Sequence, residues 1–356
     1  MLACTESWSE NTGVAIDWRW RSLESFGDTP LEELADEVDL LVIDHPFCGT
    51  AAASGCLRPF DTIMDQADLD VLAADAIGAS HASYSFAGHQ WALATDAACQ
   101  VSAVRDDLLD GLAPTTWDEV LALARAVPGR VAVPLAPAHA ISSFLSLCAN
   151  AGSPAAANPE QLVDGGAGEQ ALEIMFELAR LGPEAATGWE PPDALAQLCD
   201  TDELIYLPLT YGYVTYASGC RFLDLPSAGL GPVGSVLGGA GLAVSATATE
   251  PHLAAAFAVA ASGSFHQVTF VAPAGGQPGS ATAWHDPAID AAAGGFYSGT
   301  IATIEAAWVR PRDAWWPAFQ LESGLLLTRS LEERQHPAAV FAALESLYLD
   351  HLRRLS

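Results

Sequence analysis

The sequence predicts an α/β fold in two lobes that are joined by more than one chain crossing. Its 356 residues are enough for two domains, since a domain takes roughly 150 residues. Strand-like and helix-like segments alternate through the first half, which favours a parallel sheet covered by helices. No internal repeat and no long linker separates the halves, so a single connection between the lobes is not expected.

Helices and strands alternate over the first hundred residues. We expect a short helix over 2–11, a strand over 13–20, where apolar and polar residues alternate, and a helix over 31–38. The helix over 31–38 opens with a capping box at Thr29 and Glu32, with Pro30 at its first position. The apolar run 39–45 is typical of a buried parallel strand, and 49–56 of a short helix. Residues 89–104 predict two strands that are broken at Thr95 and Asp96.

Further elements follow in the second part of the chain. Thr116 and Glu119 form a second capping box, which predicts a helix over 114–127. Strands are expected over 129–136, over 202–209 and at the end of the Gly-rich segment 230–246. Helices are expected over 140–152, 168–182 and 251–261, with a closing amphipathic helix over 331–355.

Charge and composition exclude several classes of function. The formal net charge is -30, and all 14 basic residues are arginines. Such an acidic surface repels phosphate backbones and anionic lipids, so we expect neither nucleic-acid nor membrane-surface binding. Hydrophobic residues make up 51%, as in a globular protein, but no apolar run approaches the ~20 residues that span a bilayer.

The seven cysteines show neither a CxxC pair nor the spacing of metal ligands. Most lie in apolar segments and are interpreted as small core residues, which favours a reducing compartment; a Cys48–Cys56 bridge is the alternative. The first residues contain neither the basic nor the apolar region of a secretory signal.

Several segments resemble a known family, the extracellular solute-binding proteins of ABC importers, in particular the carbohydrate-type group. They occur in the expected order over nearly the whole chain, and none is a catalytic motif. The segments are DLLVIDHPFCGTAAASGCLRPFD (39–61), SYSFAGHQWALATDAACQVSAVRDDLL (83–109), PTTWDEVLALAR (114–125), LIYLPLTYGYVTY (204–216), VLGGAGLAVSATATEPHLAAAFAVAASG (236–263), GGQPGSATAW (275–284) and WVRPRDAWWPAFQ (308–320).

The resemblance implies a two-lobed periplasmic-binding-protein-like fold (type II), with hinge-linked lobes and a ligand cleft between them. Lobe one would comprise 1–95 plus 237–305, lobe two 100–230, and the C-terminal helices 306–356 would pack across both. Family members usually start with a strand and a signal peptide that are not seen here. A late start codon or a truncated gene would explain both. The family implies a periplasmic location, whereas the missing signal leaves a cytoplasmic one open.

The same resemblance implies a site for a small polar solute, such as a sugar, built from aromatic faces and hydroxyl-binding groups. Most candidates follow a strand, lie at a crossing or belong to the family's ligand loop. His81 and Trp91 are further candidates in loops, and Arg312 lies where the family's chain passes near the cleft. The candidates are Asp44, His45, Phe47, His81, Trp91, Asp96, Gln100, Ser143, Tyr211, Tyr213, Gly238, Gly239, Gln277, Trp284 and Arg312.

Structural roles compete with these assignments. His45 is alternatively a loop-structuring residue, and His81 and Trp91 are alternatively packing residues. Asp96 is alternatively a backbone partner at the hinge, and one of Tyr211 and Tyr213 faces the core. Trp284 is the preferred stacking platform, with a core position as its alternative, and a structural salt bridge competes with ligand binding at Arg312.

The function expected is solute binding by hinge closure, with ABC permease subunits as partners, a monomeric chain and no cofactor. We expect no enzyme, because no GxSxG, HExxH, phosphate-loop or dinucleotide fingerprint is present. A hydrolytic or metal cluster of Asp44, His45 and His81 is the enzymatic alternative. Two further alternatives keep the fold: a cytoplasmic ligand sensor, and a metal- or anion-binding variant.

Overall fold

A computed structural model describes residues 1–20 and 30–354. The chain divides into two compact units. Unit 1 comprises Met1–Ala97, Gly238–Ile289 and Arg312–Ala314, and unit 2 comprises Ala98–Leu237, Asp290–Pro311 and Trp315–Ser356. The α/β class expected from the sequence is confirmed, and each unit has its own sheet and core.

The sheet of unit 1 is built around β8 (Leu237–Ser245). On one side β8 pairs antiparallel with β1 (Leu40–Ile43). On the other side it neighbours β5 (Leu93–Val104) and, at its end, pairs antiparallel with β2 (Leu57–Arg58). The strand expected over 39–45 is therefore confirmed, but its expected parallel pairing is wrong. An apolar run shows that a strand is buried, whereas the direction of its partner depends on a segment 200 residues away.

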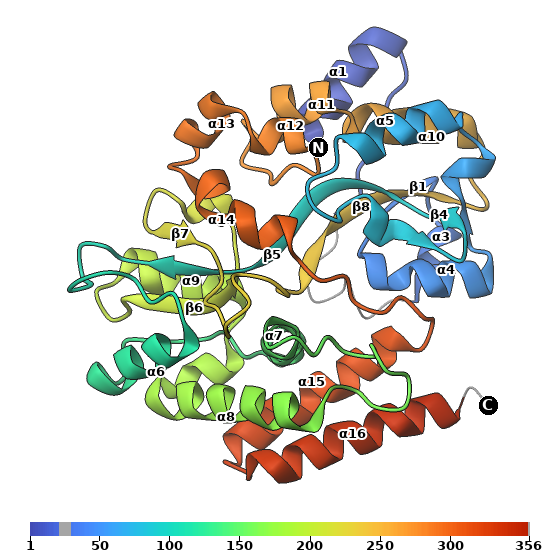
Figure 1. Ribbon diagram of the computed structural model, residues 1–356. Coiled ribbons are helices and arrows are strands. Elements are labelled where there is room, and N and C mark those ends of the chain that lie inside the picture. Colours follow the sequence, from blue (N-terminus) through green and yellow to red (C-terminus); the bar gives the residue numbers. More distant parts are fainter. Residues whose placement is uncertain (21–29, 355–356) are drawn as a thin grey trace. The chain divides into compact units, whose positions relative to one another are not determined.

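Helices cover both faces of this sheet, α5 and α10 on one and α3 and α4 on the other (Figure 1). Two apolar clusters fill the spaces: Leu31, Ile43 and Ala51 belong to the first, and Phe60, Leu242 and Phe257 to the second. The bounds in unit 1 are α1 (Leu2–Thr12), α3 (Leu31–Ala35), η1 (His45–Phe47), α4 (Cys48–Ser54), η2 (Phe60–Thr62), α5 (Gln66–Ala74), η3 (Ala82–Tyr84), β3 (Ser85–Phe86), β4 (His89–Gln90), α10 (Pro251–Ser262), α11 (Ser264–His266), the π-helical turn η6 (Gln267–Val271) and α12 (Ala281–Trp284), with α13 (Pro287–Ala292) at its end.

Three local predictions in unit 1 are not confirmed by the structure. Residues 13–20 form neither strand nor helix. Trp18 packs edge-on against Phe257 of α10, so the apolar residues of this alternating segment pack on a helix and not in a sheet. Thr29 lies outside the described residues, and α3 begins at Leu31. The expected break at Thr95 and Asp96 is wrong, because β5 continues through both.

The second half of β5 belongs to the sheet of unit 2. It pairs antiparallel with β6 (Tyr206–Tyr211), where Gln100 lies opposite Tyr211, and with β7 (Arg221–Leu223), where Ala103 lies opposite Phe222. The bounds of the other elements in unit 2 are α6 (Trp117–Ala126), α7 (Pro137–Asn150), α8 (Gly165–Leu181), η4 (Glu184–Gly188), α9 (Pro191–Asp200), η5 (Val214–Tyr216), α14 (Phe296–Glu305), α15 (Trp316–Glu332) and α16 (Pro337–Arg353).

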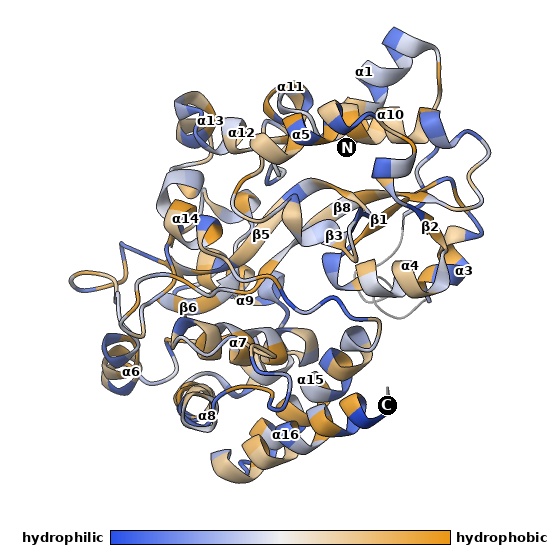
Figure 2. Cartoon of the chain, turned by 45° about the vertical axis from the view of Figure 1, so that its right-hand side comes forward, coloured by the Kyte–Doolittle hydropathy of each residue, from blue (hydrophilic) through white to orange (hydrophobic). Residues whose placement is uncertain are grey.

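Helix α7 is the centre of unit 2. Every residue from Ala140 to Asn150 is buried, because α15 and α8 pack against α7 and α16 packs against α8. The hydropathy colouring marks apolar residues along α7 (Figure 2). The capping box of α6 is confirmed: Thr116 accepts from the Glu119 amide, and the Glu119 carboxylate accepts from the Thr116 amide.

Three predictions for the second half differ from the structure. Residues 129–136 form no strand, and Val131 makes only an isolated bridge to Tyr206. The closing helix is two helices, since the chain turns at Arg334 (φ 53°) and restarts at Pro337. The C-terminal helices belong to unit 2, as does α14, which packs on β7 and whose Thr303 binds the Asp224 carboxylate.

Among the described residues, no single helix combines the length and hydrophobicity needed to cross a bilayer; Pro251–Ser262 and Ser264–Val271 meet that requirement only together, across a bend of 56°. All seven cysteines are free thiols, so the bridge between Cys48 and Cys56 is not formed.

Candidate functional site

In unit 1, three of the predicted residues meet beside β5. The Asp96 carboxylate accepts from the Gln277 amide at 3.3 Å, and the Gln277 carbonyl accepts from the Ala97 amide at 2.8 Å. Gly239 lies against the same strand with φ 118°, and a Cβ there would lie 2.3 Å from the Asp96 carbonyl oxygen. Only glycine permits this approach, so Gly238–Gly239 brings β8 close to Asp96.

The environment of Asp96 changes its acidity. Burial raises the pKa of the Asp96 carboxyl to about 6, and the hydrogen bond from the Gln277 amide opposes the shift. A carboxyl of this kind changes between proton donor and acceptor close to neutral pH, which suits it to bind hydroxyl groups.

The loop before α12 is held by buried Gln267 of the π-helical turn. Its side-chain amide donates to the Ala261 carbonyl and accepts from the Gly279 amide, both bonds being 2.7–2.8 Å. Trp284 is only 3% exposed, and its indole N–H donates to the Pro278 carbonyl at 2.6 Å. This geometry favours the core position of Trp284 over its preferred assignment as an open stacking platform.

Asp44, His45, Phe47 and Arg312 meet elsewhere in unit 1, around η3. Asp44 accepts from the His45 amide and caps η1, while the fully buried His45 ring packs edge-on against Tyr84. Arg312 donates to the carbonyls of Ala82, Ser83 and Ser85. Phe47 packs on the neighbouring apolar cluster. These contacts favour the structural interpretation of the group, although Arg312 binds carbonyls and not the expected carboxylate.

His81 and Trp91 are also occupied by the protein. Trp91 is buried and its indole donates to the Phe86 carbonyl at 3.0 Å. The pKa of His81 is lowered by burial, and its carbonyl accepts from the Gln90 side chain. Trp91 is therefore a packing residue, and His81 is a half-buried imidazole whose burial disfavours protonation.

In unit 2, Gln100 and Ser143 belong to a buried hydrogen-bond network. The Gln100 amide donates to the Ser143 hydroxyl at 3.0 Å and accepts from Ser146 at 2.6 Å. The Ser146 oxygen accepts from the Val236 amide, and Ser235 donates to the Gln100 carbonyl. All four side chains are fully buried, so this network ties β5 to α7 and to the chain before β8.

Tyr211 ends β6 and Tyr213 follows it, and both are half-buried. The Tyr211 ring lies 5.7 Å from the His139 ring, edge to face. His139 in the first turn of α7 is hydrogen-bonded to the Glu190 carboxylate. That bond lowers the pKa of Glu190, against the effect of burial, so an aromatic face and a charged acceptor lie next to each other.

His139 and Glu190 were missed by the sequence interpretation. A weak signal exists, because each lies next to a proline that opens a helix, in Pro137–Ala138–His139 and in Glu190–Pro191. Neither segment reveals that the Ala136 amide binds the Trp189 carbonyl, which brings the two together.

Within residues 1–20 and 30–354, no group of three or more His, Cys, Asp or Glu side chains is arranged to hold a metal ion. The proposed cluster of Asp44, His45 and His81 is consequently not a metal-ligand set.

Comparison with solved structures identifies the fold. A solute-binding protein from Thermotoga lettingae bound with α-D-tagatose superposes with a TM-score of 0.84 at 15% identity, covering 99% of this chain and 95% of that one. Maltose-bound MalE3 of T. maritima gives 0.82 at 18%, covering 100% and 95%. A ribitol complex from Agrobacterium radiobacter K84 gives 0.82 at 17%, covering 98% and 94%. The predicted two-lobed binding-protein fold is confirmed.

The sequence comparisons give the family. No curated protein matches the sequence. The model of the family described as "Bacterial extracellular solute-binding protein" matches residues 31–294, which is most of the chain and includes Asp96, Tyr211 and Gln277. The chain therefore belongs to the bacterial extracellular solute-binding protein family.

Proposed function

We propose that this chain is the substrate-binding component of an ABC importer for a sugar or polyol. The observation that carries the proposal is the likeness over almost the full length to binding proteins solved with tagatose, maltose and ribitol. A permease partner, a periplasmic location and a monomeric chain are parts of the same proposal.

The chemistry of both units supports a ligand that is rich in hydroxyl groups. Unit 1 provides Asp96, whose carboxylate accepts hydrogen bonds, and Gly239, whose backbone lies against that of Asp96. Unit 2 provides the half-buried ring of Tyr211 beside His139 and Glu190. Aromatic faces bind the apolar C–H patches of sugars, and carboxylates bind pairs of hydroxyls. We infer that each set is a candidate to contact such a ligand, and that ligand binding shifts the chain toward the state that retains the ligand.

A ligand panel tests the proposal. The purified chain is screened by thermal shift against monosaccharides, maltose-type oligosaccharides, pentitols and hexitols, with amino acids and divalent metals as other classes. A ligand at about 100 times its Kd stabilises the protein by about 2.7 kcal/mol, so we expect a saturable increase in Tm with at least one sugar or polyol. Stabilisation only by an amino acid or a metal would contradict the proposal.

Variants then test the site by calorimetry with the ligand found. Asp96→Ala should weaken binding by roughly 1–3 kcal/mol, whereas Asp110→Ala, an exposed aspartate, should leave it unchanged. Tyr211→Ala should weaken binding by a similar amount, and Tyr211→Phe should retain most of the affinity because the ring face remains. Unchanged affinity in both alanine variants would reject this set of residues without affecting the ligand class.

A further inference from the structure

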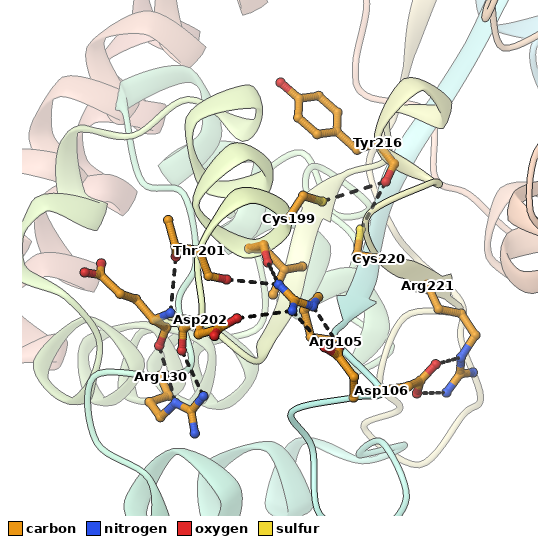
Figure 3. Close-up of polar contacts among 12 residues, drawn as sticks. Arg105, Asp106, Arg130, Cys199, Thr201, Asp202, Tyr216, Cys220 and Arg221 are labelled. Carbon is orange, nitrogen blue, oxygen red and sulfur yellow. Dashed lines mark hydrogen bonds and ion pairs between the residues drawn. The ribbon is translucent and has the colours of Figure 1, made fainter.

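Two cysteines of unit 2 lie side by side (Figure 3). Cys199 is in the last turn of α9, and Cys220 directly precedes β7. Each thiol donates to the carbonyl oxygen of Tyr216, with both sulfurs 3.7 Å from that oxygen. The fold thus brings together two cysteines that are about twenty residues apart in the sequence.

The backbone beside Cys220 permits this approach. A Cβ at Gly219 would lie 2.7 Å from the Cβ and 3.0 Å from the sulfur of Cys199, so the residue next to Cys220 has no room for a side chain. A disulfide needs Cβ atoms about 3.5–4.5 Å apart, and the close passage of the two segments is what such a bond requires.

The two thiols differ in accessibility and acidity. Cys199 is half-buried, and Cys220 is 8% exposed. The neighbouring Cys220 thiol lowers the pKa of Cys199, with burial and Asp200 opposing and Arg105 assisting. The Cys199 thiol, together with burial, raises the pKa of Cys220. Cys199 is therefore the thiol that reacts first, because the thiolate is the nucleophile.

Arg105 provides the positive charge at this position. Its guanidinium donates to the carbonyls of Leu198 and Thr201, both at 3.0 Å, and pairs with Asp107 and Asp202. The bonds to Leu198 and Thr201 fix it at the end of α9, on either side of Cys199.

We propose that Cys199 and Cys220 are a redox pair that closes to a disulfide by exchange with a disulfide compound. The Cys199 thiolate attacks one sulfur of that compound, forms a mixed disulfide and releases one thiolate, which is then protonated. Cys220 loses its proton and attacks the Cys199 sulfur, which releases the second thiol. Two protein thiols are oxidised, and one disulfide is reduced to two thiols.

The surroundings tolerate the loss of both S–H groups. The Tyr216 carbonyl also accepts from the amides of Gly219 at 2.9 Å and Cys220 at 3.3 Å, so it keeps hydrogen-bond partners in the oxidised state. The bond would close the segment 199–220, which contains β6, Tyr211 and Tyr213. Oxidation therefore constrains the unfolded chain of unit 2 and fixes the segment that carries two candidate ligand residues.

Peptide mapping of the full chain tests the pair. The protein is incubated with oxidised glutathione or with a reducing agent, alkylated under denaturing conditions and digested with trypsin plus a protease that cleaves after glutamate. Trypsin alone leaves both cysteines in one peptide, because the flanking arginines are Arg180 and Arg221, whereas cleavage after Glu203 separates them. We expect a Cys199–Cys220 cross-link and a decrease from seven to five free thiols. Seven remaining thiols, two separate glutathione adducts or a different pairing would overturn the proposal.

Variants connect the bond to stability. Oxidation should raise the Tm of unit 2 by roughly 5–10 °C, as expected for a loop of this length. Cys199→Ser and Cys220→Ser should each abolish the cross-link and this increase, and Cys56→Ser, a half-buried cysteine of unit 1, should retain both. If the buried Cys220 variant does not fold, the half-buried Cys199 variant carries the test. An increase in Tm that persists in Cys199→Ser would contradict the proposed pair.

Discussion

At the scale of single residues, Asp96 makes stability depend on pH. Its pKa is raised to about 6 in the folded chain, against about 3.9 in an unfolded one. Between these two values the folded state binds more protons, so its free energy of unfolding falls as the pH rises. Above about pH 6 the full cost of the ionised carboxylate is present.

Asp96→Asn should remove this cost, because the amide oxygen still accepts from the Gln277 amide and carries no charge. We expect the variant to be more stable than the wild type by about 1–3 kcal/mol at pH 7.5 and equally stable near pH 4. Thermal unfolding of both proteins from pH 4 to 8 measures the difference. Asp110→Asn serves as the exposed control, and a constant offset at every pH would show that Asp96 does not titrate in this range.

Residue types indicated which side chains come together better than they indicated the position of each one. Asp96, Gly239 and Gln277 do meet in unit 1, and Gln100 lies opposite Tyr211 in unit 2. The sequence did not predict the exposure of the aromatic residues. Tryptophan is a residue type that sugars stack on, yet Trp91 and Trp284 are both buried, and their indole N–H groups donate to carbonyls. Burial of a large ring depends on segments that are distant in sequence.

At the scale of elements, two serines one turn apart in α7 have different roles. Ser142 donates to the carbonyl of Ala138 in its own helix. Ser146 instead donates to Gln100 of β5 and accepts from the Val236 amide, so it joins three elements. Both side chains are buried.

Ser146→Ala should therefore destabilise unit 2 by roughly 2–4 kcal/mol, because it leaves the side-chain carbonyl of Gln100 and the backbone amide of Val236 without their partner. Ser142→Ala should cost less than about 1 kcal/mol, since the helix carbonyl keeps its backbone donor. Denaturant unfolding of both variants measures the difference, and equal effects would mean that the network does not stabilise the junction of β5 with α7.

Helices were predicted from sequence more reliably than strands. The capping box at Thr116 and Glu119 is a local pattern, and α6 begins where it indicates. A strand needs a partner, which local sequence does not provide. Residues 13–20 alternate like a strand but have none, and Val131 finds only a single bridge.

At the scale of the whole molecule, the net charge of -30 opposes the compact state through self-repulsion. Added salt screens these charges, with a Debye length of about 10 Å at 0.1 M. We expect the Tm at pH 7 to rise by several degrees between about 0.01 and 0.5 M sodium chloride.

The same titration near the sequence pI of 4.3 is the control, because the net charge is small there and the effect of salt should largely disappear. A Tm that falls with salt at pH 7 would mean that the ion pairs of the fourteen arginines outweigh the repulsion.

Two units were expected, and the expected limits at 95, 100, 230 and 237 lie next to the crossings at Ala97–Ala98 and Leu237–Gly238. The further crossings at 289–290, 311–312 and 314–315 were not anticipated. The assignment of α14 and the C-terminal helices depends on side-chain packing, such as that of α15 on α7, which amphipathic patterns do not specify.

The position of β8 in the chain has a consequence for biosynthesis. This strand is the partner of β1 and β2, yet about two hundred residues are translated between β1 and β8. At 5–20 residues per second the ribosome needs about 10–40 s for that interval. Throughout it the nascent first segment has no strand to complete its sheet, and this delay would keep the polypeptide unfolded long enough for chaperones or a translocation channel to engage it.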